Sequence, residues 1–239
     1  VGSGAFMESV EAAEELSREM LAIANLAGRR AVALISDMNQ PLGTAVGNAL
    51  EVREAVETLQ GGGPEDFREH CIEVAGHMLV LTGRVKTLEE ARGLVVDVMT
   101  DGSALAKFRQ LVEAQHGDVS VVDDPGLLRS APVVKEVAAP ETGFVQRVDA
   151  REVGLTAVQL GAGREKKGDP IDHAVGILIH RKIGDRVQKG EPLFTVHAAD
   201  NAACDAAVER LLAAHEISLE KVDSLPLFYR TLTQEDQAS

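Results

Sequence analysis

The segment ISDMNQPLGTAVGNALEVREA, residues 35–55, changes character halfway along its length. It begins as the end of an apolar run, passes through a polar stretch with a proline and a glycine at 37–43, and then takes on helical spacing. Apolar side chains at positions 42, 46, 49, 50, 56 and 59 predict a helix over residues 42–59. Because open α/β sheets bind ligands in loops that follow their strands, the loop at 37–43 is a candidate ligand site.

Helical periodicity continues on both sides of this segment. Apolar spacing predicts helices over 8–27, 64–81, 87–100 and 103–116, and Thr87-Leu88-Glu89-Glu90 has the pattern of a capping box. The clearest strand is 30–36, whose continuous apolar centre is typical of a buried parallel strand. A single strand is not stable alone, so its partners must come from another part of the chain or from residues outside it.

The pattern changes after residue 131 to short β runs separated by turn residues. Strands are expected at 133–137, 143–148, 174–181, 185–187, 192–197 and 227–230, with a helix at 202–214. The expected fold class is α/β, with a partial α/β domain of helices on a mixed sheet followed by a smaller α+β domain. We expect the first domain at 1–117, a linker at 118–130 and the second domain at 131–239.

Composition excludes several classes of function. The 239 residues carry a formal net charge of −14, which opposes binding to nucleic-acid phosphates. No apolar run approaches the roughly 20 residues that span a bilayer. Cys71 and Cys204 are the only cysteines, so a disulfide framework is not expected and the reducing cytoplasm is the simpler location. Residues 1–7 have neither an initiator Met nor a signal-peptide pattern, and we expect them to come from the interior of a longer protein.

Three stretches together resemble one enzyme family. They are VGSGAFM at 1–7, ALISDMNQPLGTAVGNALEVREAVETL at 33–59, and the stretch from VDAREVG to FTVHA at 148–198. They are similar to the pyrimidine-nucleoside phosphorylases of the thymidine phosphorylase family, and to the broad-specificity members more than to the strict thymidine enzymes. The resemblance implies phosphorolysis of uridine or thymidine to the free base and a pentose 1-phosphate. It also implies inorganic phosphate as co-substrate, no organic cofactor, a homodimer and a cytoplasmic location.

The chain departs from the family pattern in its extent. Family members carry a long N-terminal part before the stretch that matches VGSGAFM, with a Lys-, Ser- and Thr-rich phosphate loop and the residues that hold the base. This sequence contains none of that part, so the resemblance implies the C-terminal half of such an enzyme. We therefore expect no catalytic residue here, an N-terminal half of the same enzyme as partner, and no activity from the chain alone.

The resemblance assigns four site residues to the chain. Phe6 would pack against the pyrimidine, and its alternative is a core phenylalanine behind a tight glycine turn. Leu42 and Ala45 would offer main-chain carbonyls, and Glu54 its carboxylate, to a hard cation such as K⁺. The alternative for these three residues is ordinary helix capping beside a solvated glutamate.

Other polar groups carry weaker hypotheses. His70 and Cys71 share a predicted helix with His77, and satisfied surface or core histidines are the alternative to a metal-ligand pair. The run Arg164-Glu165-Lys166-Lys167 is read first as a solvated loop, with phosphate steering as the second hypothesis.

Two rival functions are open. KIGDRVQKGEPLFTV, residues 182–196, resembles the hammerhead of biotinyl and lipoyl carrier modules, which would make the chain a carrier. Lys182 and Lys189 lie in this motif but lack the flanking residues of a modified lysine, so we interpret the similarity as a shared fold. In the other reading the chain only docks on a separate N-terminal half, and it would then expose apolar surface.

Overall fold

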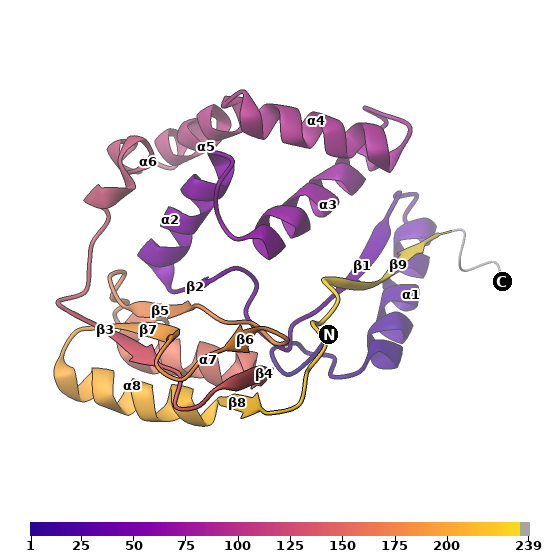
Figure 1. Ribbon diagram of the computed structural model, residues 1–239. Helices are drawn as coiled ribbons and strands as arrows, with labels where there is room; N and C mark the ends of the chain where they lie inside the picture. The colour runs from indigo at the N-terminus through magenta and orange to yellow at the C-terminus, as the bar shows by residue number, and fades with distance from the viewer. Residues whose placement is uncertain (235–239) are drawn as a thin grey trace.

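Helices dominate the first half of the structure, a computed structural model that describes residues 1–234. The helices predicted at 8–27, 64–81, 87–100, 103–116 and 202–214 are confirmed with small shifts at the ends. The capping box at Thr87 is present, with the Thr87 hydroxyl accepting a hydrogen bond from Glu90 N. Helices α2 to α5 form one group, and α1 lies apart from them (Figure 1). The helices are α1 (Val10–Leu26), α2 (Asn48–Leu59), α3 (Glu65–Leu81), α4 (Leu88–Thr100) and α5 (Ser103–Ala114).

Two strands far apart in the sequence form a small sheet. Strand β1 (Val32–Ser36) pairs with β9 (Phe228–Thr233), and Leu21 of α1 packs on Ile35 and Leu232. Of the two sources expected for partners of β1, another part of the chain supplies β9. The predicted parallel pairing is wrong for the described residues, because β9 returns from the far end of the chain and runs antiparallel to β1.

The second half is built from short antiparallel strands. One sheet has the order β2-β5-β7-β3 and another the order β6-β4-β8. Together with helices α7 and α8 they enclose the largest apolar cluster of the described residues, which contains Phe194, Val196 and Ile177. The elements are β2 (Ala45–Val46), β3 (Val133–Ala138), β4 (Gly143–Val148), α7 (Ala150–Ala157), the π-turn η2 (Val158–Ala162), β5 (Gly176–Ile179), β6 (Arg186–Val187), β7 (Pro192–Ala198), α8 (Asn201–Ala213) and β8 (His215–Ser218).

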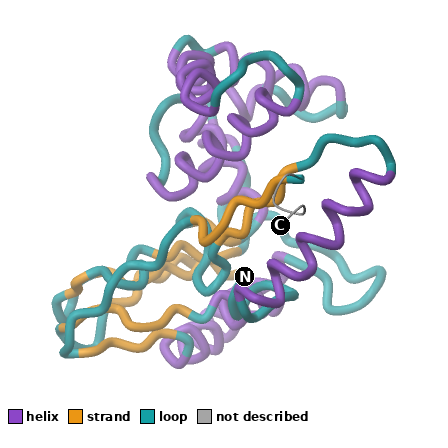
Figure 2. Tube along the Cα trace, turned by 90° about the vertical axis from the view of Figure 1, so that its right-hand side faces the viewer, coloured by secondary structure: helices purple, strands orange, loops and turns teal. Residues whose placement is uncertain are grey.

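The expected α/β class is confirmed, although every strand pair among residues 1–234 is antiparallel. Helix α7 was not expected from the sequence. The connector at 118–130 contains α6 (Ser120–Asp123) and the 3-10 turn η1 (Pro125–Leu127). Figure 2 shows α2 to α5 grouped above the strands of the second half, with the long helix α1 beside the β1–β9 pair. The domain boundaries stay a prediction.

The predicted start of the 42–59 helix is wrong. Residues 42–47 form a loop and the short strand β2, and helix α2 begins only at Asn48. Gly43 has φ +67° and Gly47 has φ +135°, conformations that interrupt a right-handed helix. Strand β2 pairs with β5, with Ala45 opposite Leu178 and Val46 opposite Ile177. Residues 35–55 therefore join the helical half to the β-rich half.

His215 is expected to make the protein less stable in mild acid. Its ring is 8% exposed, stacks on Phe194, and has Nδ1 2.7 Å from the Leu211 carbonyl oxygen. Burial lowers the pKa of His215, so the unfolded chain binds this proton more readily than the folded protein. The stability contributed by the neutral ring is therefore complete above about pH 6.5 and falls as the pH drops, by up to about 1.4 kcal/mol per pH unit.

Urea unfolding at a series of pH values from neutral to mildly acidic checks this expectation. The variant His215→Phe should show a shallower loss of stability toward acid than the parent protein. Some acid sensitivity should remain, because burial also lowers the pKa values of His180 and His197. The exposed His116 provides the control, and His116→Asn should keep the parent slope. Equal slopes for the parent and His215→Phe would contradict the prediction.

None of the helices in residues 1–234 combines the length and the apolar character that crossing a bilayer requires.

Candidate functional site

Glu54 organises the loop that precedes its own helix. Its side chain extends from the second turn of α2 back toward residues 44 and 45, and the residue is only 7% exposed. One carboxylate oxygen, Oε1, accepts hydrogen bonds from Thr44 N at 2.8 Å, Thr44 Oγ1 at 2.5 Å and Ala45 N at 3.0 Å. Hydrogen bonds to a carboxylate are stronger than those between neutral groups. The alternative of a solvated Glu54 is therefore wrong.

A second set of polar groups binds the same loop. Asp66, at the start of α3, accepts a hydrogen bond from Gly43 N at 3.1 Å. The Lys182 ammonium lies 3.1 Å from the same Asp66 oxygen and donates to the carbonyl oxygens of Pro41 and Gly43. The next residue of that turn, Ile183, donates its amide to Gln40 Oε1 at 2.8 Å. The loop is thus bound by side chains from α2, from α3 and from the β-rich half.

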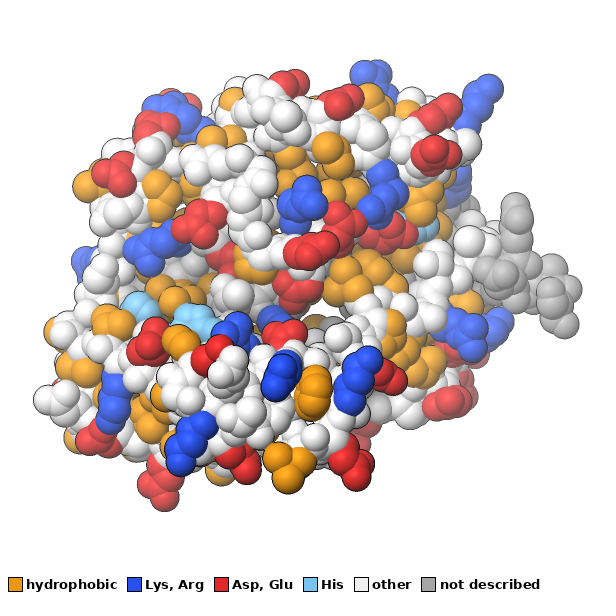
Figure 3. Space-filling model, viewed as in Figure 1, with side chains coloured by type: hydrophobic (Ala, Val, Ile, Leu, Met, Phe, Trp, Pro, Cys, Tyr) orange, Lys and Arg blue, Asp and Glu red, His pale blue; other side chains and the backbone are white. Residues whose placement is uncertain are grey.

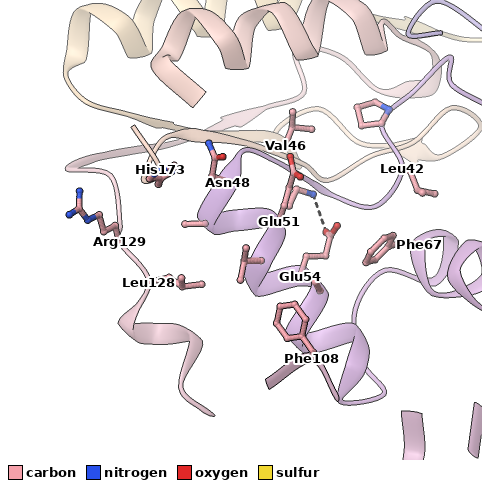
Figure 4. Close-up of a pocket in the computed structure, with 15 residues that line it drawn as sticks. Leu42, Val46, Asn48, Glu51, Glu54, Phe67, Phe108, Leu128, Arg129 and His173 are labelled. Atoms are coloured by element: carbon pink, nitrogen blue, oxygen red, sulfur yellow. Dashed lines mark hydrogen bonds between the residues drawn. The ribbon is translucent and has the colours of Figure 1, made fainter. Parts of the chain in front are cut away.

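Next to this loop lies a cavity of about 900 Å³. Helix α2 forms one wall, Phe67 and Phe108 contribute apolar surface, and the connector contributes Leu128 and Arg129 (Figure 4). Leu42, Ala45 and Glu54 all line this cavity, so the structure brings together the three residues expected at a cation site. In the space-filling view, charged side chains of both signs surround the hollow between the helices and the β-strands (Figure 3).

Phe6 lies elsewhere. It is fully exposed on the loop before α1, so the alternative of a core phenylalanine is wrong. That loop is attached to the end of β1, because Gly4 N donates to Met38 O at 2.9 Å and Met38 N donates to Val1 O at 2.8 Å. Phe6 is not among the residues that line the cavity beside Glu54. Its contact with a pyrimidine stays a prediction.

The amides and the carboxylate after β1 hold the strand end together. Asn39 donates its backbone and side-chain N–H groups to Asp37, at 3.2 and 2.7 Å, and the Tyr229 hydroxyl donates to Asp37 Oδ1 at 2.9 Å. Burial, followed by the bonded Asp37, raises the pKa of Tyr229, so its hydroxyl stays protonated at neutral pH. These polar residues therefore satisfy the backbone at the tip of the strand and attach β9 to it.

The remaining polar candidates have ordinary surroundings. His70 stacks on Phe228 with ring centroids 4.9 Å apart, and His77 Nε2 lies 3.2 Å from Glu73 Oε1. No group of three His, Cys, Asp or Glu side chains within residues 1–234 is arranged to hold a metal ion. The run 164–167 is an exposed loop, with Arg164 Nε donating to Asp169 O at 3.1 Å.

Sequence reasoning missed the residues that bind the loop from outside its own helix. Asp66 was read only as part of a predicted helix, and Lys182 was considered only as a carrier lysine. The contacts of Lys182 with Pro41 and Gly43 span 141 and 139 residues, so no local pattern could have indicated them.

Two family models match the chain. The model described as "Glycosyl transferase family, a/b domain" covers residues 1–105, and "Pyrimidine nucleoside phosphorylase C-terminal domain" covers residues 144–218. The chain is 50% identical to the pyrimidine-nucleoside phosphorylase of Bacillus subtilis (strain 168) over 197 residues, which are 82% of this chain and 46% of that protein. It is 45% identical to the pyrimidine-nucleoside phosphorylase of Geobacillus stearothermophilus over 228 residues, or 95% of this chain and 52% of that protein.

A third relative gives the same result. The chain is 46% identical to the pyrimidine-nucleoside phosphorylase of Staphylococcus haemolyticus (strain JCSC1435) over 219 residues, which cover 92% of this chain and 50% of that protein. The chain thus spans about half the length of the curated relatives it matches.

Proposed function

Because the chain belongs to the pyrimidine-nucleoside phosphorylase family, we propose that it forms part of a pentosyltransferase that cleaves uridine or thymidine with inorganic phosphate. A phosphate oxygen forms a bond to C1′ of the sugar while the bond from C1′ to the pyrimidine nitrogen breaks. The pyrimidine leaves with the electron pair and takes up a proton. The products are the free base and a pentose 1-phosphate.

This reaction requires two kinds of group. Donors must hold the phosphate, and a further group must stabilise negative charge on the departing pyrimidine while the sugar becomes positively charged. We place both in the part of the relatives that this chain does not span. The contribution of this chain is the scaffold that carries the loop after β1. The observation that supports this role is the buried Glu54 carboxylate, whose three hydrogen bonds attach Thr44 and Ala45 of the loop to α2.

We also propose that this loop contributes ligands to a hard cation such as K⁺. Within the described residues, the Glu54 carboxylate accepts its hydrogen bonds through Oε1, so Oε2 keeps its lone pairs for a ligand. Leu42 and Ala45 line the same cavity as Glu54, and their carbonyl oxygens match the preference of such ions for oxygen. A bound cation would supply positive charge next to this buried carboxylate. The remaining ligands would come from outside the chain.

Helix α1 exposes an apolar face, which supports the presence of a protein partner with an apolar surface. Met20, Ile23 and Leu26 are 62%, 65% and 89% exposed, which is unusual for three large apolar side chains on one helix. We propose that the rest of the enzyme covers this face, and that the complete enzyme is a homodimer. The carrier alternative is not supported, since the matched relatives are phosphorylases and the Lys182 ammonium is bound to main-chain carbonyls.

Phosphorolysis tests the proposed function. We expect uracil release from uridine plus phosphate by the protein expressed together with the coding sequence that precedes Val1. The 239-residue chain alone should release no more uracil than a protein-free control, because it lacks the phosphate-binding and base-binding groups. Chromatography of uracil, with phosphate omitted as a second control, measures both. Uracil release by the chain alone would contradict the scaffold role, and no release by the longer protein would contradict the family activity.

A further inference from the structure

Lys182 holds its charge in a site built from main-chain and side-chain oxygens. The residue lies in the turn between β5 and β6, and its side chain is 20% exposed. The ammonium donates to Pro41 O and Gly43 O and lies 3.1 Å from Asp66 Oδ2. Two carbonyls and one carboxylate around one positive charge are the kind of oxygen site that a small monovalent cation also prefers.

The backbone of Lys182 is held in place as well. Its amide donates to Asp185 Oδ2 at 2.8 Å, and the amide of Ile183 donates to Gln40 Oε1 at 2.8 Å. The backbone amide of Lys182 is therefore held within its own turn, and the amide of Ile183 is held by the loop after β1. This distinguishes Lys182 from exposed lysines, whose ion pairs contribute little because the side chain must lose freedom to form them.

A negative side chain binds the backbone amides of the loop, and a positive side chain binds its backbone carbonyls. The Glu54 carboxylate accepts from the amides of residues 44 and 45, whereas the Lys182 ammonium binds the carbonyls of residues 41 and 43. Asp66 joins the two sets, since it accepts from Gly43 N and pairs with Lys182. Removal of the ammonium would leave the Pro41 and Gly43 carbonyls without this donor, and the Asp66 carboxylate beside them with backbone amides as its only donors within residues 1–234.

We propose that Lys182 is a positioning residue for the 41–45 loop. Its ammonium occupies a site for a monovalent cation that is formed by Pro41 O, Gly43 O and Asp66. With the lysine side chain removed, the same site accepts a free ammonium or alkali ion. This role concerns the conformation of the loop, and its test uses no catalytic activity, so its failure is separate from a failure of the proposed phosphorolysis.

The test compares two variants of the protein expressed from its full coding sequence. Lys182→Ala empties the site, and Lys182→Met fills most of its volume without a charge. In tetramethylammonium chloride, whose cation is too large for the site, both variants should unfold about 5 °C or more below the parent protein. Ammonium chloride at the same concentration should restore at least half of the loss in Lys182→Ala and little of it in Lys182→Met.

The comparison between the two variants isolates this site. The proposed cation site at Glu54 is the same in both variants, so a salt effect that acts there cannot distinguish them. Lys189→Ala, a change at an exposed lysine of the next turn, controls for net charge and should leave the midpoint within about 1 °C. Equal ammonium effects in the two Lys182 variants, or a Lys182→Ala midpoint equal to that of the parent, would overturn the proposal.

One further outcome is decisive. If Lys182→Ala does not fold in tetramethylammonium chloride, the proposal requires that ammonium restores a cooperative unfolding transition. A variant that ammonium does not restore contradicts it. Asp66→Asn supplies an independent check, because Lys182 still fills the site in that protein. Its unfolding midpoint should fall, but ammonium should not raise it more than it raises that of the parent.

Discussion

Replacement of Glu54 with alanine should lower the free energy of unfolding by about 3–5 kcal/mol. The carboxylate is buried, and its removal leaves the amides of Thr44 and Ala45 and the Thr44 hydroxyl without their acceptor. Water cannot replace all three bonds without opening the loop away from α2. Glu54→Gln keeps an oxygen of the same reach, so its cost should be smaller, at about 1–2 kcal/mol.

Urea unfolding followed by circular dichroism measures these losses. Hydrogen exchange adds a local measurement, because the amides of residues 44 and 45 should lose protection in Glu54→Ala before the rest of the chain does. Glu57 provides the matched control, since it is an exposed glutamate three residues further along the same helix. Glu57→Ala should change stability by no more than about 0.5 kcal/mol. The importance of the buried carboxylate would be refuted by equal losses in Glu54→Ala and Glu57→Ala.

A methyl group at Gly47 should cost about 3 kcal/mol and weaken the attachment of α2 to the β-rich half. Gly47 has φ +135°, and a Cβ placed there would lie 2.7 Å from Val175 O and 2.8 Å from the Gly176 Cα. The opposing glycine is equally crowded, since a Cβ at Gly176 would lie 2.5 Å from Val46 O. These obstacles are backbone atoms in or directly beside the paired strands β2 and β5, so they cannot rotate away as a side chain would.

Gly93→Ala is the control for this second prediction. Gly93 lies inside helix α4, and a Cβ there meets no atom within 4 Å. Alanine favours the helix over glycine, so this variant should be unchanged or more stable by up to about 1 kcal/mol. Thermal unfolding of Gly47→Ala, Gly176→Ala and Gly93→Ala measures the contrast. A Gly47→Ala protein as stable as Gly93→Ala would show that β2 and β5 do not need this close approach.

Local sequence patterns determined most of the helices and the approximate positions of most strands. The capping box at Thr87 and the apolar spacing of 64–81 concern residues within a few turns of one another, and such short-range effects act wherever the segment lies. The same periodicity misled at residues 42–47, because Leu42 and Val46 continue the helical spacing into a loop. The competing factors were the positive φ at Gly43 and Gly47 and the pairing of β2 with β5.

The candidate site could be described only from the sequence motifs and the tertiary structure together. The motifs at 1–7, 33–59 and 148–198 together indicated the family and, through it, Leu42, Ala45 and Glu54. Only the tertiary structure showed that the Glu54 carboxylate is buried and bonded to the loop's amides, and that Lys182 binds the carbonyls of the same loop. The physical reason is sequence distance. Local patterns record contacts within a helix or a turn, whereas burial, strand partners and the pairing of Lys182 with a loop about 140 residues away arise only when the chain folds.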